Sequence, residues 1–469
     1  MKRKLFCSKI SGSLSSLTSA IQRSLILQHL RKYKSMPTLN ASEIVRGHIL
    51  QVTSAALGHG AEELKDGALL LDTKGHILKK GNFADISKEY SSLPVRDYSG
   101  SLILPSFFDT HIHFPQLDMI GSCAEELLLW LQRYTFPREA AFRGRTQFVK
   151  DAAKNFVDEL ASNGTSFAVV YSSSCGEATD VLFEEFERRG LRVILGKTSM
   201  DRHCPDEISV DVEQDKAWTE MLIKKWHKKT DRLHYALTPR FAPSCTNELM
   251  AMLAKLHDDD PSLYMQTHYA ENRNEIEWVA ELYPEAKSYL DVYDSRDLLN
   301  SKTILAHSIH TNAEDEQLLL ERDVVISHCP TSNLFLGSGL FKGKSYLEQG
   351  LKVTLGTDVG AGTSFSQWQS MNEAYKVAQL KQERLSPSDI FALATVAAGK
   401  HLGFPNLGCL EEGYIADFQV IDPESRPILA RHLAMATTAE ERLTALIHFA
   451  DDRCLKELNI QGQPVYKRA

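Results

Sequence analysis

The chain has 469 residues, of which 43% are hydrophobic and 24% are charged. This length permits one large catalytic domain with a smaller one, and the composition is typical of a soluble globular protein. No apolar run reaches the ~18 residues that cross a bilayer, and the net charge of −8 argues against a nucleic-acid or anionic membrane surface. We therefore expect no nucleic-acid and no membrane partner.

The eight cysteines are scattered and form no Cys-x-x-Cys pair. In a long chain this pattern is typical of reduced thiols, so we expect a cytoplasmic protein. Residues 1–42 stand apart, with eight Lys or Arg and no Asp or Glu, which leaves −16 on the rest of the chain. This basic, Ser-rich leader has the composition of a mitochondrial transit peptide. A disordered tail, or an extension upstream of a second start at Met36, is the alternative.

Both flanks of the chain are patterned as short strands. Residues 67–82 form two apolar runs around a Thr-Lys-Gly turn, which predicts a hairpin. Residues 412–424 alternate polar and apolar side chains in the same way. We predict that residues 43–100 and 405–469 pair into one small β-sandwich domain.

Between the flanks the pattern changes to alternating strands and helices. Eight short apolar runs have the character of strands buried on both faces. They are residues 102–109, 165–171, 191–197, 233–239, 263–268, 303–308, 324–329 and 352–358. Amphipathic segments such as 146–164 separate most of them. Residues 101–404 are therefore predicted to form an α/β fold, a (β/α)8 TIM-like barrel. A doubly wound open sheet is the alternative, and the count of eight favours closure.

Residues that can bind a metal follow several of these strands. His111 and His113 end the first strand, and because residues i and i+2 point the same way, both imidazoles face one side. His268, His307 and Asp358 end the fifth, sixth and eighth strands. A barrel brings the carboxyl ends of its strands together. Imidazole and carboxylate groups suit Zn²⁺ or a similar divalent ion, so the sequence predicts a metal site.

Four more residues lie where they could serve chemistry. Glu271 follows His268 by three positions. It could act as a general acid/base, or it could stabilise a helix N-terminus with its charge. Arg240 and Phe241 follow the fourth strand and suit a planar, oxygen-bearing heterocycle, the alternative being a rim arginine and a core phenylalanine. Lys197 ends the third strand, where a salt bridge is favoured over a bridging role in a two-metal site.

The remaining histidines carry less information. His328 ends the seventh strand and either touches substrate or orders a loop. We expect His203, His234 and His310 to be solvated or structural.

The motifs PSFFDTHIH, His-x-x-Glu, AHSIH, SHCPTSN and GTD resemble those of mononuclear deaminases of the amidohydrolase superfamily. Within it, residues 129–139, 196–206, 237–245 and 268–276 resemble the guanine deaminase family. The resemblance runs from about residue 45 to the C-terminus. Ser106 and Phe107 depart from it, since family members more often carry Gly and a smaller aliphatic residue there. Neither position is a predicted ligand.

The resemblance implies one Zn²⁺ per chain and a set of roles. The implied metal ligands are His111, His113, His268 and Asp358. The implied catalytic residues are Glu271, which moves protons, with His307 and Asp358, which orient and deprotonate the attacking water. The implied substrate-binding residues are Gln116, Arg240, Phe241, His268, Glu271 and Asp358.

The activity that the resemblance implies is hydrolytic deamination of guanine to xanthine and ammonia, in purine metabolism, by a cytoplasmic homodimer. Another heterocycle, such as 8-oxoguanine or cytosine, is the first alternative. A non-catalytic scaffold with the same barrel is the second, and the intact ligand positions argue against it.

Overall fold

The computed structural model describes residues 40–123 and 127–468. Residues 1–39, which make up nearly all of the predicted leader, lie outside the described residues. The transit peptide and the second start at Met36 therefore stay predictions. Within the described ranges, no helix combines the length and the apolar character needed to cross a membrane.

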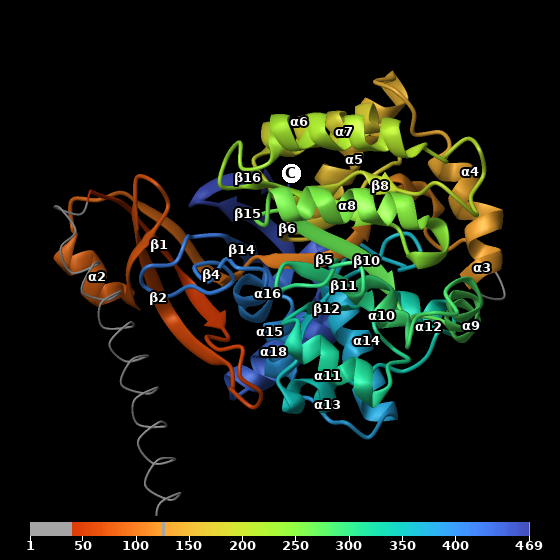
Figure 1. The fold of residues 1–469 in the computed structure, drawn as a ribbon. Helices are drawn as coiled ribbons and strands as arrows, with labels where there is room; N and C mark the ends of the chain where they lie inside the picture. The colour runs from red at the N-terminus through yellow and green to blue at the C-terminus, as the bar shows by residue number, and fades with distance from the viewer. Residues whose placement is uncertain (1–39, 124–126, 469) are drawn as a thin grey trace, which may run out of the picture.

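The two flanks of the chain pair in one β sheet. Its seven strands follow the order β16-β15-β14-β4-β1-β2-β3. They are β1 (Ala41–Gln51), β2 (Glu62–Asp72), β3 (Ile77–Asn82), β4 (Val95–Pro105), β14 (Phe418–Ile421), β15 (Leu455–Ile460) and β16 (Gln463–Lys467). The predicted hairpin is β2 and β3, and β14 pairs antiparallel with β4. These strands form one hydrogen-bonded sheet at the left of Figure 1.

Alternation along the strands gives this sheet two apolar faces. On one face Val45 and Leu69 pack with Phe418. On the other, Leu70 packs with Ile86 from helix α2 (Phe83–Glu89). The short helix thus covers a face that would otherwise expose apolar side chains.

Eight parallel strands form the barrel. In order they are β5 (Phe107–His113), β6 (Thr165–Tyr171), β7 (Arg192–Gly196), β9 (Leu233–Pro239), β10 (Tyr264–Tyr269), β11 (Thr303–His307), β12 (Val325–His328) and β13 (Lys352–Leu355), with the two-residue β8 (Thr198–Ser199) beside β9. The ends meet where Asp358 N donates to His111 O at 2.8 Å and His113 N donates to Val359 O at 2.8 Å. These bonds close the ring, so the barrel prediction is confirmed and the open sheet is excluded.

The first predicted strand, 102–109, is divided between the two sheets. β4 ends at Pro105, and β5 begins at Phe107. Ser106 N donates to Asp417 O in the β domain at 3.1 Å, whereas Phe107 N donates to Gly164 O beside the barrel at 2.9 Å. The run is buried throughout, so its apolar pattern gives no sign that the chain changes its hydrogen-bonding partner. The prediction of a single strand over 102–109 was therefore wrong.

Helices surround the barrel. They are α5 (Gln147–Ser162), α6 (Gly176–Arg189), α7 (Val212–Trp226), α8 (Asn247–Asp259), α9 (Arg273–Leu282), α10 (Tyr289–Asp294), α11 (Ala313–Glu321), α12 (Pro330–Phe335), α13 (Gly343–Gln349), α14 (Gln367–Leu380), α15 (Pro387–Leu393), α16 (Val396–His401), α17 (Pro427–Met435) and α18 (Ala439–Phe449). Thr146 caps α5 by accepting from Val149 N at 3.3 Å. Beyond its end, Gly164 takes a left-handed φ of 80°, which suits glycine.

One long connection lies over the carboxyl end of the barrel. After β5 the chain forms the 3₁₀ helix η1 (Phe114–Met119), then α3 (Leu127–Trp130), the π-helical η2 (Leu131–Thr135) and α4 (Phe136–Glu139). In Figure 1, α3, α4, α9 and α12 gather at the right, away from the β domain. This end of the barrel holds the predicted site.

Candidate active site

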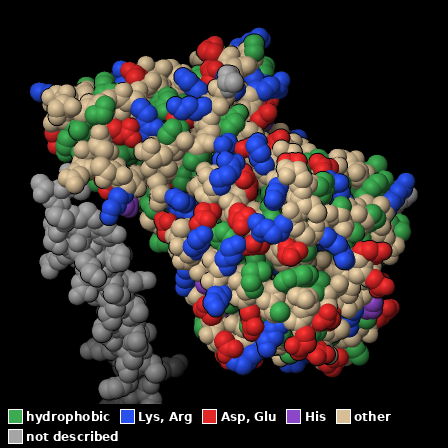
Figure 2. Space-filling view, turned by 90° about the horizontal axis from the view of Figure 1, so that it is seen from above, with side chains coloured by type: hydrophobic (Ala, Val, Ile, Leu, Met, Phe, Trp, Pro, Cys, Tyr) green, Lys and Arg blue, Asp and Glu red, His purple; other side chains and the backbone are tan. Residues whose placement is uncertain are grey.

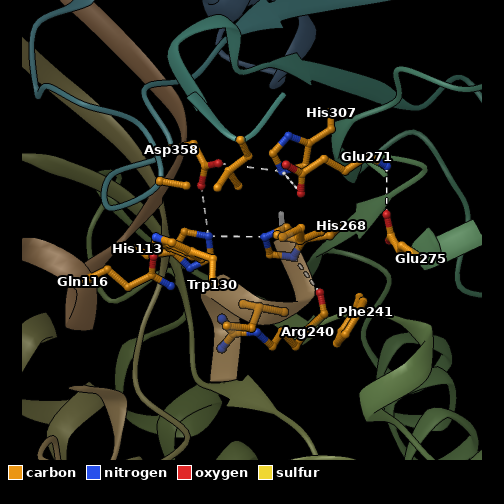
Figure 3. A pocket seen from close by; sticks show the side chains of 14 residues that line it. His113, Gln116, Trp130, Arg240, Phe241, His268, Glu271, Glu275, His307 and Asp358 are labelled. Carbon is orange, nitrogen blue, oxygen red and sulfur yellow. Dashed lines mark hydrogen bonds and ion pairs between the residues drawn. The ribbon is translucent and has the colours of Figure 1, made fainter. Parts of the chain in front are cut away.

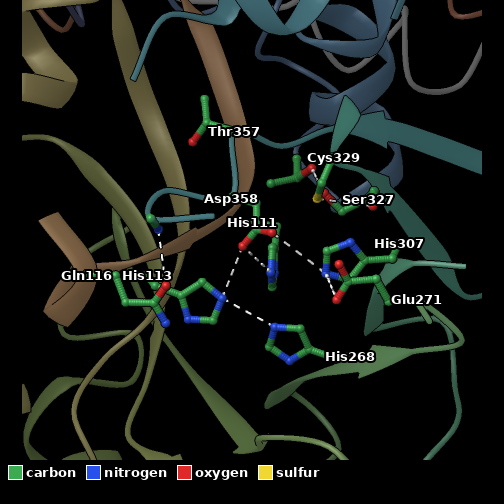
Figure 4. Close-up of polar contacts among 12 residues, drawn as sticks. His111, His113, Gln116, His268, Glu271, His307, Ser327, Cys329, Thr357 and Asp358 are labelled. Carbon is green, nitrogen blue, oxygen red and sulfur yellow. Dashed lines mark hydrogen bonds and ion pairs between the residues drawn. The ribbon is translucent and has the colours of Figure 1, made fainter. Parts of the chain in front are cut away.

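The four predicted metal ligands converge at the carboxyl end of the barrel. Their ligand atoms all lie within 4.8 Å of one another. His111 and His113 come from β5, His268 from β10, and Asp358 from the turn after β13. Figure 4 shows the three imidazoles and the carboxylate pointing toward one another. Three are buried and His268 is half-buried, so water competes little for their ligand atoms.

A hydrogen bond behind His268 fixes which of its two ring nitrogens is free to bind a metal. His268 Nδ1 lies 2.7 Å from the backbone oxygen of Arg240. A carbonyl only accepts, so Nδ1 carries the proton and Nε2 presents a lone pair. That Nε2 lies 3.2 Å from His113 Nε2, and His111 Nε2 is buried without a hydrogen-bond partner among the described residues. Three imidazole nitrogens that face one point are the arrangement that a cation stabilises.

The spacing and protonation of the cluster fit a divalent metal. Nε2 of His111 and of His113 each lie 3.2 Å from Asp358 Oδ1. Ligands bound at 2.0–2.1 Å in a tetrahedral zinc site are about 3.3 Å apart. Burial lowers the pKa of His113 to about 4 and that of His268 well below its usual value. Both imidazoles are therefore neutral near pH 7. Neutral imidazole is the form that binds metal.

A second grouping includes Cys329, together with His111, His307 and Asp358. Burial, followed by the Asp358 charge, raises the pKa of the Cys329 thiol well above its usual value. A protonated thiol is a poor ligand. The three-histidine set with Asp358 is therefore the better metal site.

Glu271 and His307 lie beside this cluster. Glu271 Oε2 is 3.4 Å from His307 Nε2, and Glu271 Oε1 accepts from Ser338 Oγ at 2.9 Å. His307 Nδ1 lies 2.9 Å from Asn333 Oδ1, and its Nε2 is 3.8 Å from Asp358 Oδ2. Burial, and after it the Asp358 charge, raise the pKa of Glu271 to about 8. At neutral pH such a carboxyl holds a proton that it can donate.

A pocket opens from the cluster toward the residues predicted to bind a substrate. Gln116, Arg240 and Phe241 line it, together with Glu271 and Asp358. In Figure 3, Glu271 and His307 lie above His268, whereas Gln116 and Arg240 lie below it. The remaining wall consists of His113, Leu127, Trp130, Leu131, His268, Glu275, His307, Leu336 and Ala361. The pocket thus joins an apolar wall to polar groups of different kinds, as small-molecule sites do.

Some of these pocket residues were absent from the sequence prediction. Leu127, Trp130 and Leu131 belong to the connection after β5, and Glu139 at its end bonds to Gln116 and Arg240 at 2.9 and 2.6 Å. The stretch 129–139 resembled the guanine deaminase family, which was the available signal. Its helical pattern did not show which side chains enter the pocket.

Asp109 also had no role in the sequence prediction. It is buried, and its Oδ1 accepts from Thr357 N at 2.9 Å. This bond holds the turn that bears Asp358, whose φ is 52°; His307 has a φ of 71°. Such angles are rare for residues other than glycine and cost roughly 1–3 kcal/mol each. The surrounding contacts, including those of Asp109, must offset that strain.

The other singled-out residues lie outside the pocket wall. Lys197 is fully buried in an ion pair with Asp215, as favoured above. His328 is buried, and its ring stacks on that of Phe341 with 4.2 Å between the ring centroids. This contact agrees with the alternative in which His328 orders a loop. His203 is exposed, and His234 and His310 are half-buried, with ring nitrogens near the backbone oxygens of Pro243, Asp231 and Ser338.

Known proteins share this sequence and architecture. The amidohydrolase family matches residues 102–465. The guanine deaminase of Escherichia coli K12 is 38% identical over 431 residues, which cover 90% of this chain and 98% of that protein. The solved structure of E. coli guanine deaminase has a TM-score of 0.87 at 37% identity, covering 91% of this chain and 100% of that one. A C. acetobutylicum guanine deaminase solved with guanine in its active site has a TM-score of 0.84 at 31% identity, covering 90% and 100%. This chain therefore belongs to the amidohydrolase family.

Proposed function

We propose that this protein is a guanine deaminase, which hydrolyses guanine to xanthine and ammonia. The observation that carries the proposal is one buried pocket that joins the three-histidine and Asp358 cluster, the Glu271 carboxyl and the donors of Arg240 and Gln116. The similarity to proteins named guanine deaminase, one of them with guanine bound, supports this choice of substrate.

The metal proposed for this site is one Zn²⁺ per chain. His111, His113, His268 and Asp358 would hold it, because two or more imidazoles with a carboxylate suit that ion. Bound there, Zn²⁺ supplies Lewis-acid activation of a water molecule near neutral pH.

The protein's own groups then move the protons. Glu271 donates its proton to a ring nitrogen of guanine, which makes C2 more electrophilic. Asp358 and His307 orient the attacking water and accept its proton. Its oxygen bonds to C2, the accepted proton passes through the now ionised Glu271 to the amino nitrogen, and the C2–N bond of the tetrahedral carbon breaks to release ammonia. The remaining hydroxyl proton returns to Glu271 as the C2=O group of xanthine forms. The geometry suits this relay, because Glu271 Oε2 and Asp358 Oδ2 lie 3.4 and 3.8 Å from the same His307 nitrogen.

Recognition of the base is assigned to the opposite side of the pocket. Arg240 offers only donors, so it can satisfy the 6-oxo group of guanine and meets the 6-amino group of adenine unfavourably. Phe241 lines the same pocket and offers a ring face to a planar base. Gln116 would share the polar contacts.

The test is an ammonia-release screen on purified protein with guanine, adenine, cytosine, their nucleosides and 8-oxoguanine, together with elemental analysis for metal. Guanine should be turned over fastest, with about one zinc per chain. Faster release from another base would replace the substrate, and no release from any base with an empty metal site would favour a scaffold. A homodimer is part of the proposal, and light scattering on the same sample measures it.

A further inference from the structure

Glu139 is a buried carboxylate between the two residues proposed to hold the base. It is the last residue of α4 and is 4% exposed. Its Oε1 accepts from Gln116 Nε2 at 2.9 Å, and its Oε2 accepts from Arg240 Nη1 at 2.6 Å. Both acceptor atoms are thus used by pocket residues. Glu139 itself is absent from the pocket wall, so any effect on a substrate passes through these partners.

The amide of Gln116 is held in one orientation. Gly360 N donates to Gln116 Oε1 at 3.1 Å, while the amide nitrogen faces the Glu139 carboxylate. A flipped amide would set its NH₂ against the N–H of Gly360 and its oxygen against Glu139, and both contacts are repulsive. The second N–H of Gln116 is therefore the group left for a substrate, and it is a donor.

The guanidinium of Arg240 is fixed by the same short helix. It is 3% exposed, and its Cζ lies 5.5 Å from the ring centroid of Phe136, three residues before Glu139. Removing one partner of a buried ion pair leaves an uncompensated charge, which is strongly unfavourable. Glu139 binds Arg240 through Nη1. The carboxylate thus neutralises the cation and sets the direction in which its other N–H groups point.

We propose that Glu139 is a positioning residue for base choice, which makes Gln116 and Arg240 present N–H donors together to the acceptors of a 6-oxopurine. This inference rests on the proposed function, because it assigns the donors to guanine. It concerns the recognition side of the pocket, away from the metal cluster. It predicts that a change at Glu139 alters which base is preferred and leaves metal binding unaltered.

The test is Glu139→Gln, assayed for kcat/KM on guanine and on 2-aminopurine, which lacks the 6-oxo group. An amide at position 139 can accept from one partner but turns its NH₂ toward the other, so the donor pair is disrupted. The kcat/KM for guanine should fall about 10–100-fold, whereas that for 2-aminopurine should change less than about threefold. The ratio of the two kcat/KM values measures how much more strongly the pocket binds one base than the other in the transition state. Zinc content should equal that of the parent.

Two controls separate positioning from general damage. Glu457→Gln makes the same change at a buried carboxylate of the β domain, which accepts from Tyr98 Oη at 2.6 Å, and should alter neither rate. In an Arg240→Ala background, Glu139→Gln should cause no further loss on guanine, because residues that act as a unit are not additive.

An equal loss on both bases, or an unchanged rate on guanine, would overturn the inference. If Glu139→Gln does not fold, Glu139→Asp keeps the charge but shortens the reach by one methylene, and the same selective loss is expected with a smaller size. Equal or absent losses in that variant count against the inference in the same way. A parent protein inactive on guanine would instead refute the proposed function.

Discussion

At the scale of single residues, one contact often fixes a side chain so that its other end is free for chemistry. His268 and His307 each place Nδ1 near an oxygen, of the Arg240 backbone and of Asn333, and turn Nε2 toward the cluster. Gln116 is held through Oε1 in the same manner. Such outer contacts keep reacting groups in place at little entropic cost during the reaction.

Removal of a ligand should remove both metal and activity. His111→Ala and His268→Ala each delete one of four ligand atoms in a buried cluster, so we expect less than a tenth of the parent's metal content and no measurable turnover. Elemental analysis and ammonia release check this. His234→Ala is the matched control, since His234 lies on barrel strand β9 near its opposite end. Two tightly held metals per parent chain would contradict the mononuclear site.

Glu271→Gln should keep the metal and lose most turnover. The amide preserves the shape and can still bond to Ser338, but it cannot carry a proton between base and amine. General acid/base groups typically contribute ~10²–10⁴-fold, and kcat should fall by that factor. Steady-state kinetics with metal analysis measure it. A nearly normal rate would assign proton transfer to another group, of which His307 is the nearest.

Arg240→Ala should weaken base recognition without loss of metal. The variant removes the donor assigned to the 6-oxo group and leaves Glu139 as a buried carboxylate without its cation. A lost contact of this kind costs ~1–3 kcal/mol or more, so kcat/KM for guanine should fall roughly 10–10³-fold. If the variant deaminates guanine as well as the parent does, the base sits elsewhere in the pocket.

At the scale of elements, the site depends on strand ends and the segments that follow them. β5 and β11 end at His113 and His307, β10 carries His268 one residue before its end, and the turn after β13 carries Asp358. The connection from η1 to α4 adds the apolar wall and Glu139. Rigid strands therefore place the groups that meet the metal, while a less regular segment shapes the space for a base.

Lys197 follows β7 at the same end of the barrel as the metal cluster, and we predict a structural role for it. Lys197 and Asp215 of α7 are both fully buried and form an ion pair, and Asp215 also accepts from Ser199 Oγ at 3.0 Å. Lys197→Met should lower the free energy of unfolding by about 3–5 kcal/mol, the cost of an uncompensated buried charge. Urea unfolding measures it.

Two further measurements decide how that result is understood. In Lys197→Met/Asp215→Asn the remaining charge is gone while the amide can still accept from Ser199, so much of the stability should return. Metal content of the single variant should stay at one per chain. A loss of metal with normal stability would return Lys197 to the metal site.

At the scale of the whole molecule, the β domain and the barrel share a buried connection. Arg192 at the start of β7 donates from Nε to Asp417 Oδ2 at 2.6 Å, and both side chains are buried. Asp417 immediately precedes β14, so this pair joins the barrel to the C-terminal flank. On the face shown in Figure 2, acidic and basic side chains are interspersed, without one dominant charge.

A chain that begins at Met36 should fold and deaminate normally. The described strands of the β domain begin at Ala41, so the truncation removes none of them. We expect kcat/KM within about twofold of the full chain and an unchanged melting temperature, measured by ammonia release and calorimetry, since contributions of independent parts add. Loss of folding would show that the leader packs on the protein.

The targeting prediction needs a separate experiment. A fluorescent fusion of residues 1–42 should be imported into mitochondria if the leader is a transit peptide. A purely cytosolic signal would contradict that prediction and would leave the proposed chemistry unaffected.

The sequence by itself determined the class of fold and the set of candidate ligands. Eight buried strands separated by helices predict a closed barrel, and His-x-His at a strand end puts two imidazoles on one side. Both follow from local patterns, because burial on two faces makes a strand apolar throughout and the two-residue repeat of a strand puts residues i and i+2 on one side. The proximity of His111, His113, His268 and Asp358 then follows from the barrel, since parallel strands end on the same side.

Only the tertiary structure decided which distant groups meet. The change of partner at Ser106 is hidden in a continuous apolar run, because the pattern records burial and not the neighbour that causes it. Glu139 meets Arg240 from 101 residues away, through an irregular segment without a simple period. Asp109 reaches Thr357 across the closure of the barrel. Such contacts depend on how whole segments pack, and a single sequence carries no local signal for them.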